Sequence, residues 1–298
     1  MSIGFIGAGK VGTALGLYLK QKGFLISGYY SKTLASSQQS AAKTKSLCFN
    51  RIDQLVECSD ILFITTPDDQ IEAAVKALSL SAKLRTEQLI IHTSGALAST
   101  VLEALTCYGC GIFSMHPLQS FAEENKALCD LPHTYFCIEG TEARTHELEA
   151  ILNTCGNKYF MLKPEQKTLY HAAACMISNY FVTLMHHGLQ LLECVNISKD
   201  IGYEAMLPLI TGTLQNVSAL GTENALTGPI SRGDVKTIEK HLQAIQAAAP
   251  HQLALYTALA EETLKLASLS KLKNPDAIDK LKTLLSGNNK ETNTNDFL

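Results

Sequence analysis

The chain has 298 residues, of which 46% are apolar and only 18% charged, and its formal net charge is −3. This length suffices for two domains with sizeable cores, and the near-neutral charge excludes the basic face that nucleic-acid binding requires. The nine cysteines form no regular framework, and no apolar run reaches the about 20 residues of a membrane span. We therefore expect a cytoplasmic protein with reduced thiols.

Short β-rich runs alternate with helical stretches over residues 1–164. The pattern predicts strands at 3–6, 25–30, 61–65, 89–93, 112–116, 134–138 and 159–162, with helices such as 71–80 and 96–104 between them. Such alternation indicates an α/β fold with a doubly wound parallel sheet of the Rossmann type.

Beyond Pro164 the pattern is helical only. Residues 165–195, interrupted only by Gly188 and apolar around most of the circumference, predict one long and largely buried helix. Further helices are predicted at 203–220, 234–247, 250–269 and 275–285. We expect a dinucleotide-binding domain at 1–164, a helical substrate and dimerisation domain at 165–285, and a disordered tail at 286–298.

The first strand leads into a G-x-G-x-x-G sequence, residues 7–12, that opens an amphipathic helix. The first glycine allows a tight turn, the second lets the backbone approach a pyrophosphate, and the third lets helix and strand pack closely. After the second strand, Ser31-Lys32-Thr33 stands where NAD-binding proteins place an acidic residue. We therefore predict NADP(H), bound by Gly7, Gly9, Lys10, Val11, Gly12, Ser31, Lys32, Thr66, Pro67 and Ser94.

Three polar loops follow later strands and should line the cofactor cleft at the carboxyl edge of the sheet. They read Thr65-Thr66-Pro67-Asp68-Asp69, His92-Thr93-Ser94-Gly95 and His116-Pro117-Leu118-Gln119-Ser120. Ser, Thr, Pro and Asp also cap helices and form turns, and Asp68 is expected to be such a cap.

Polar residues gather on one side of the predicted long helix: Lys167, His171, Cys175, Ser178 and Asn179. Buried polar groups need partners, which a ligand or a neighbouring helix would supply. Arg232, in a loop bounded by glycine and proline, has a planar fork that suits a substrate carboxylate, with an ion pair to Asp234 as the alternative. The cysteine and histidine spacings do not indicate a metal site.

Taken together, GFIGAGKVGTAL, TTPDD, HTSGAL, HPLQSF, YHAAACMISNY and LTGPISRGD resemble a Rossmann-like reductase family long catalogued as a domain of unknown function. That family is similar to 6-phosphogluconate dehydrogenase-like and β-hydroxyacid dehydrogenase-like enzymes. The resemblance implies a helical C-terminal domain, a homodimer and, for some members, ketopantoate reduction in pantothenate synthesis. Cys175 stands where β-hydroxyacid dehydrogenases have a lysine, so the resemblance does not identify the proton donor.

These observations predict an NADPH-dependent oxidoreductase that reduces a small 2-keto acid, with ketopantoate as the named substrate. A histidine fits the proton donor, and we favour His171 over His116, with Lys167 next. Asn179 would orient the substrate or the nicotinamide. The substrate-binding residues would be Ser94, His116, Gln119, Asn179 and Arg232. The alternatives are a dehydrogenase of another hydroxy or imino acid, and a non-catalytic NADP(H) sensor.

Overall fold

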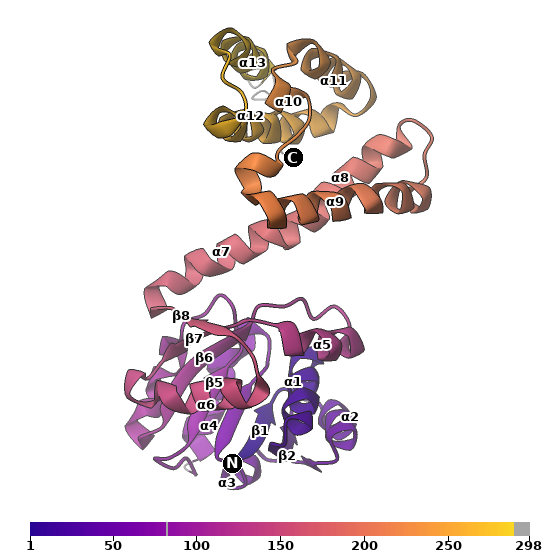
Figure 1. Cartoon of the computed structure of the whole chain (residues 1–298). Helices are drawn as coiled ribbons and strands as arrows, with labels where there is room; N and C mark the ends of the chain where they lie inside the picture. The colour runs from indigo at the N-terminus through magenta and orange to yellow at the C-terminus, as the bar shows by residue number, and fades with distance from the viewer. Residues whose placement is uncertain (82, 289–298) are drawn as a thin grey trace. The chain divides into compact units, whose positions relative to one another are not determined.

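The computed structural model describes residues 1–81 and 83–288, which divide into two units, Met1–Ser178 and Asn179–Leu298. The first unit holds all the strands of the described chain (Figure 1). The strands are β1 (Ser2–Ile6), β2 (Leu25–Tyr30), β3 (Leu47–Cys48), β4 (Ile61–Ile64), β5 (Leu89–His92), β6 (Gly111–Pro117), β7 (Phe136–Gly140) and β8 (Tyr159–Met161). Its α-helices are α1 (Lys10–Gln21), α2 (Leu34–Thr44), α3 (Ile52–Glu57), α4 (Ile71–Ser81), α5 (Glu124–Asp130), α6 (Thr145–Cys155) and α7 (Lys167–Ile177).

The strands form one sheet in the order β3-β2-β1-β4-β5-β6-β7-β8. Strands β1 to β6 are parallel to their neighbours, which confirms the doubly wound Rossmann prediction, while β7 is antiparallel to β6 and parallel to β8. The register pairs Ile6 with Ile64, and Ile64 with His92. The carboxyl ends of β1, β4 and β5 therefore meet at one edge, which we call the carboxyl edge.

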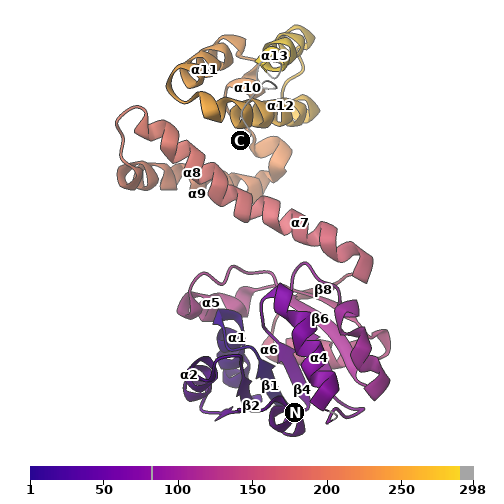
Figure 2. The same ribbon diagram turned by 180° about the vertical axis from the view of Figure 1, so that it is seen from behind.

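Helices cover both faces of the sheet because alternate strand residues point to opposite sides. Phe5, Phe63 and Ile91 pack in one core with residues of α1, α5 and α6, while Leu62 and Ile90 pack in a second core with residues of α3 and α4. Helix α6 lies in front of the sheet in Figure 1, and α4 lies in front of it in the reverse view of Figure 2.

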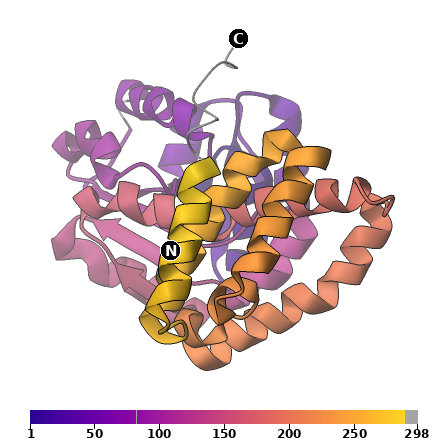
Figure 3. The same ribbon diagram turned by 90° about the horizontal axis from the view of Figure 1, so that it is seen from above.

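The second unit is helical, as predicted. Its helices are α8 (Asn179–Glu193), α9 (Lys199–Ala225), α10 (Pro229–Arg232), α11 (Val235–Ala248), α12 (Leu253–Ser270) and α13 (Pro275–Asn288). Helix α12 packs against α9, α10, α11 and α13, which appear in orange to yellow in Figure 3, and buried leucines such as Leu242, Leu264 and Leu281 form their core. None of the described helices is both long and apolar enough to cross a bilayer.

Several local predictions were wrong. The helix expected over 165–195 is two helices, which meet at Ser178, where φ is −103° rather than the about −63° of a regular helix, and Gly188 does not interrupt α8. Buried positions are few along this run, so its apolar surface is largely exposed. Residues 99–108 form a 3₁₀ helix rather than an α-helix. The tail expected to be disordered from 286 begins inside α13, and 289–298 lie outside the described residues.

The boundary predicted at Pro164 marks the change from alternating elements to helices. The contact-based division falls after Ser178 instead, so α7 belongs to the same unit as the sheet. This placement matters for the site, because α7 carries Lys167, Tyr170 and His171.

Candidate active site

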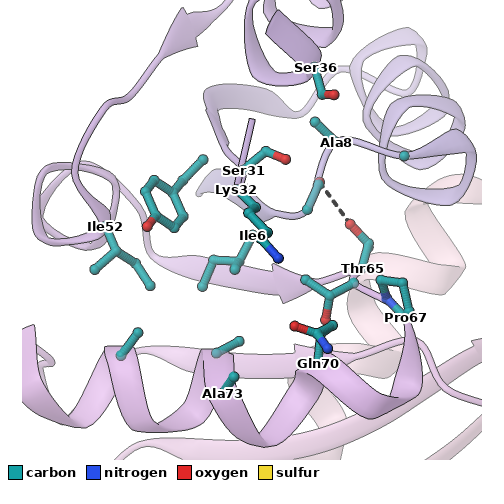
Figure 4. Close-up of a pocket in the computed structure, with 16 residues that line it drawn as sticks. Ile6, Ala8, Ser31, Lys32, Ser36, Ile52, Thr65, Pro67, Gln70 and Ala73 are labelled. Atoms are coloured by element: carbon teal, nitrogen blue, oxygen red, sulfur yellow. Dashed lines mark hydrogen bonds between the residues drawn. The ribbon is translucent and has the colours of Figure 1, made fainter. Parts of the chain in front are cut away.

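The glycine loop between β1 and α1 is shaped by close approach to the end of β4. Gly7 has φ of +107°, and a Cβ there would lie 2.8 Å from the carbonyl carbon of Thr65. A Cβ on Gly12 would meet the Thr65 hydroxyl, which donates to the carbonyl of Gly7 at 2.9 Å (Figure 4). These two glycines are therefore required by the fold itself.

Gly9 is different, because a Cβ added there would meet nothing within 4 Å. The residue N-caps α1 without any side-chain hydrogen bond, so the first backbone N–H groups of the helix have no side-chain partner there. An open cradle at a helix N-terminus is the arrangement that binds phosphate.

A cavity of about 500 Å³ extends from this loop along the carboxyl edge (Figure 4). Its lining includes Gly7, Gly9, Ser31, Lys32, Thr66 and Pro67, all predicted to bind the cofactor, together with Ile52, Gln70 and alanines of α4. The Thr66 hydroxyl is buried without a hydrogen-bond partner among the described residues. An orphaned buried hydroxyl and an open glycine cradle both fit a dinucleotide in this cavity.

The end of the cavity beside β2 carries hydroxyls and an amine. Ser31, Lys32 and Ser36 line it, and no acidic side chain is among the described lining residues. Lys32 points into the cavity in Figure 4 and has no ion-pair partner in the described chain. Ser36, which the sequence analysis missed, shares a hydrogen bond of 2.7 Å with Thr33. Together these groups can receive a 2′-phosphate.

A second cluster lies at the same carboxyl edge and joins strand ends to α7. His116 of β6 shares a 2.8 Å hydrogen bond between its Nδ1 and the Tyr170 hydroxyl. The His116 and His171 rings lie 6.4 Å apart, and a Cβ on Gly95 would lie within 2.8 Å of both rings. Cys175, one turn further along α7, has its sulfur 3.9 Å from the ring nitrogens of His171.

Burial governs the protonation of this cluster. Desolvation lowers the pKa of His116 to about 3 and that of His92 to about 4, and the positive charge of Lys167 adds to both effects. Desolvation also lowers the pKa of Lys167, whose side chain is 1% exposed, and raises the pKa of the Tyr170 hydroxyl. At neutral pH both buried imidazoles are therefore uncharged and Tyr170 is protonated.

Other predicted residues make contacts with neighbouring groups, and their predicted roles stay predictions. Lys10 donates to the carbonyl of Ala122 at 2.6 Å, and Val11 packs against the core of the first unit. The Ser94 hydroxyl donates to Asp68 at 2.8 Å and accepts from the N–H groups of residues 96 and 97. Asp68 is thus a partner of Ser94 rather than the helix cap that was expected. Gln119 faces a separate cavity beside Tyr135 and Phe160.

Asn179 and Arg232 belong to the second unit and are exposed there. Arg232 forms no ion pair within 4 Å in the described chain, and Asp234 instead caps α11 by accepting from the N–H of Thr237. The first unit alone therefore brings together His116, His171 and Lys167 from the prediction with His92 of a predicted polar loop, and adds Tyr170.

Two family models match the chain. A Rossmann-like domain covers residues 1–117, and a domain of unknown function, DUF2520, covers residues 134–263. A comparison with curated proteins found no match. No group of side chains in the described chain has the composition of a metal site.

Solved structures with a similar fold include oxidoreductases. A candidate NADP oxidoreductase of Bacteroides fragilis is 27% identical, with a TM-score of 0.72 over 89% of this chain and 98% of its own. A protein of Thermotoga maritima is 22% identical, with a TM-score of 0.71 over 91% and 100%. An imine reductase of Myxococcus stipitatus in complex with NADP⁺ is 16% identical, with a TM-score of 0.66 over 96% and 100%. These likenesses confirm the Rossmann oxidoreductase fold.

Proposed function

We propose that this chain is an NADP(H)-dependent oxidoreductase that reduces the carbonyl group of a small 2-keto acid, with ketopantoate as the specific substrate. The main support for the proposal is that two features lie at the same edge of the sheet: an open cavity that suits a dinucleotide, and a cluster of buried histidines with Tyr170. The candidate NADP oxidoreductase of Bacteroides fragilis, at 27% identity, supports the cofactor and the reaction class.

The cofactor binds with its pyrophosphate on the α1 N-terminus at Gly9 and its 2′-phosphate beside Ser31 and Lys32. Thr66 supplies a hydroxyl at the boundary between the cofactor and the strand ends. Bound NADPH supplies the hydride for reduction. The role of the remaining residues is to orient the substrate and to deliver a proton to its oxygen.

His171 is the proposed proton donor, and His116 is proposed to hold the substrate oxygen by a hydrogen bond. The low pKa of His116 keeps its ring neutral and makes it a poor proton source. Tyr170 stays protonated and is able to donate to Nδ1 of His116, which leaves the ring proton on Nε2, on the side of Gly95 and His171. Asn179 and Arg232, which belong to the second unit, remain predictions as substrate-binding residues.

Imine reduction is the second candidate, because several structures of the same fold are imine reductases or a reductive aminase. Their identities to this chain are 18% or lower. The discriminating experiment measures NADPH oxidation with ketopantoate, pyruvate and a cyclic imine. Turnover of ketopantoate at least about tenfold better than pyruvate, in kcat/KM, is expected. Turnover of the imine alone would replace the proposed substrate class, and no turnover of any carbonyl or imine would favour a sensor.

A homodimer joined through the helices is also proposed. Large apolar side chains are exposed along α8 and α9, among them Tyr180, Val182, Leu209 and Leu214. Exposed apolar surface of this extent is typical of a subunit interface. Light scattering at micromolar concentration is expected to give the dimer mass, and a monomer mass would contradict the assignment.

A further inference from the structure

Two buried nitrogen atoms in the first unit lack any hydrogen-bond partner in the described chain. They are Nζ of Lys167, whose side chain is 1% exposed, and Nε2 of His92, whose side chain is 0% exposed. Buried donors without partners are rare in proteins because each carries the full cost of desolvation. Such a pair points to a group that binds there.

The protonation of His92 identifies both nitrogens as donors. The N–H of Ser94 donates to Nδ1 of His92 at 3.2 Å, so Nδ1 carries no proton. The pKa of about 4 keeps the ring neutral, and its single proton is therefore on Nε2. The ammonium of Lys167 has three protons to donate. Two donors cannot satisfy each other, so the missing partner is an acceptor.

The two carboxylates whose charge acts on Lys167 already accept hydrogen bonds from serine residues. Both carboxylate oxygens of Glu139 accept hydrogen bonds from Ser99, and the Oδ2 atom of Asp68 accepts from Ser94. Lys167 forms no ion pair within 4 Å among the described residues. The titratable groups that act on Lys167 or respond to it are Asp68, His92, His116, Cys137, Glu139 and Tyr170.

The two donors adjoin the residues proposed for the chemistry. Ser94, which orients His92, is followed directly by Gly95, against which the His116 and His171 rings are packed. Lys167 and His171 are one turn apart on α7. A 2-keto acid has its carboxylate and its carbonyl on adjacent carbons, so a substrate that binds through its carboxylate keeps its carbonyl carbon one bond away from that position.

We propose that Lys167 Nζ and His92 Nε2 form a subsite that binds the carboxylate of the substrate. The inference rests on the proposed reduction of a keto acid. It assigns the binding of the substrate carboxylate to two residues of the first unit, in place of Arg232, which belongs to the second unit. A charged amine opposite a carboxylate also selects against a cationic imine.

The test is calorimetric titration of the NADP⁺-loaded protein with oxamate, a keto-acid analogue that accepts no hydride. Lys167→Met replaces the amine by an apolar side chain of similar length. This variant is expected to bind oxamate at least about tenfold more weakly, the loss of one charge-assisted hydrogen bond, with unchanged NADP⁺ affinity. Lys163→Met removes an exposed lysine one turn upstream and serves as the matched control, with wild-type oxamate affinity expected.

A second measurement on the unaltered protein does not depend on the folding of a variant. A bound carboxylate favours the charged form of Lys167, so oxamate affinity is expected to fall as pH rises through the lowered pKa of this amine. Equal oxamate affinity in wild type and Lys167→Met, or failure of the wild type to bind oxamate, would overturn the subsite. Oxamate binding without reduction of any keto acid would refute the proposed function and leave the subsite standing.

Discussion

Acid should destabilise the sheet unit through its two buried histidines. The folded-state pKa is about 3 for His116 and about 4 for His92, both below the ordinary value of 6.5. The unfolded chain therefore binds more protons than the folded chain as pH falls below 6.5, and stability is lost over the interval down to the folded-state values. Above about pH 7.5 both rings are neutral in either state, and their contribution is constant.

The size of the effect follows from linkage. Between about pH 7.5 and pH 5, each histidine is expected to remove about 2 kcal/mol from the free energy of unfolding, or about 4 kcal/mol together. That is a large part of the about 5–15 kcal/mol that stabilises a domain. His116→Gln, which cannot be protonated, is expected to lose about half as much over the same interval.

Urea unfolding monitored by tyrosine circular dichroism measures these differences, since the chain has ten tyrosines and no tryptophan. Amide hydrogen exchange measured in β5 and β6 shows whether the acid-induced loss of stability occurs in the first unit. The protonation of carboxylates changes the free energy of unfolding equally in wild type and in His116→Gln. The difference between the two pH profiles therefore measures the contribution of His116. Identical pH dependence in both would show that the ring of His116 is not buried in a neutral form.

Three further predictions concern the cofactor and the reaction. Lys32→Ala should reduce the kcat/KM preference for NADPH over NADH by about tenfold or more, because a charge-assisted contact to the 2′-phosphate is lost; an unchanged ratio would contradict the assignment. Gly9→Ala should fold with only a small loss of thermal stability, since its Cβ meets no atom within 4 Å and alanine is a poorer N-cap than glycine, yet bind NADPH weakly in a fluorescence titration; tight binding would mean that the pyrophosphate lies elsewhere. His171→Ala should lower kcat by about 10²–10⁴, and near-normal single-turnover rates would exclude His171 as the proton donor.

The cofactor half of the site could be predicted because its signals are local. Gly7, Gly9 and Gly12 follow a strand and open a helix within a dozen residues, and the absence of an acidic residue after β2 is visible in the sequence. The cavity accordingly contains most of the predicted cofactor residues. Strand β3 was missed because it is only two residues long, too short to show an alternating pattern.

The base cluster could be predicted only in part, because it joins residues far apart in the chain. His116 and His171 were recognised from their positions at a strand end and on a helix. Tyr170 lies about 100° from His171 around the helix and was not among the predicted site residues, yet its hydroxyl reaches His116. No periodic pattern shows that Nε2 of His92 and the amine of Lys167 are both buried without acceptors.

At one edge of the sheet a buried polar side chain is hydrogen-bonded, and at the other several buried polar atoms lack partners in the described chain. This difference distinguishes polar groups that stabilise the fold from polar groups that are available to a ligand. At the amino edge, Gln88 is 1% exposed, yet its amide donates to the carbonyls of Val56 and Ser59, and its oxygen accepts from the N–H of Arg85. At the carboxyl edge, Thr66, His92 and Lys167 each keep a buried atom without a partner in the described chain. The same sheet is thus able to satisfy a buried polar side chain where only folding requires it. Within the first unit, the unsatisfied buried atoms among the described residues lie at the edge that carries the open glycine cradle, and ligands bound there would complete them, while His187 and Thr257 hold two more such atoms in the second unit.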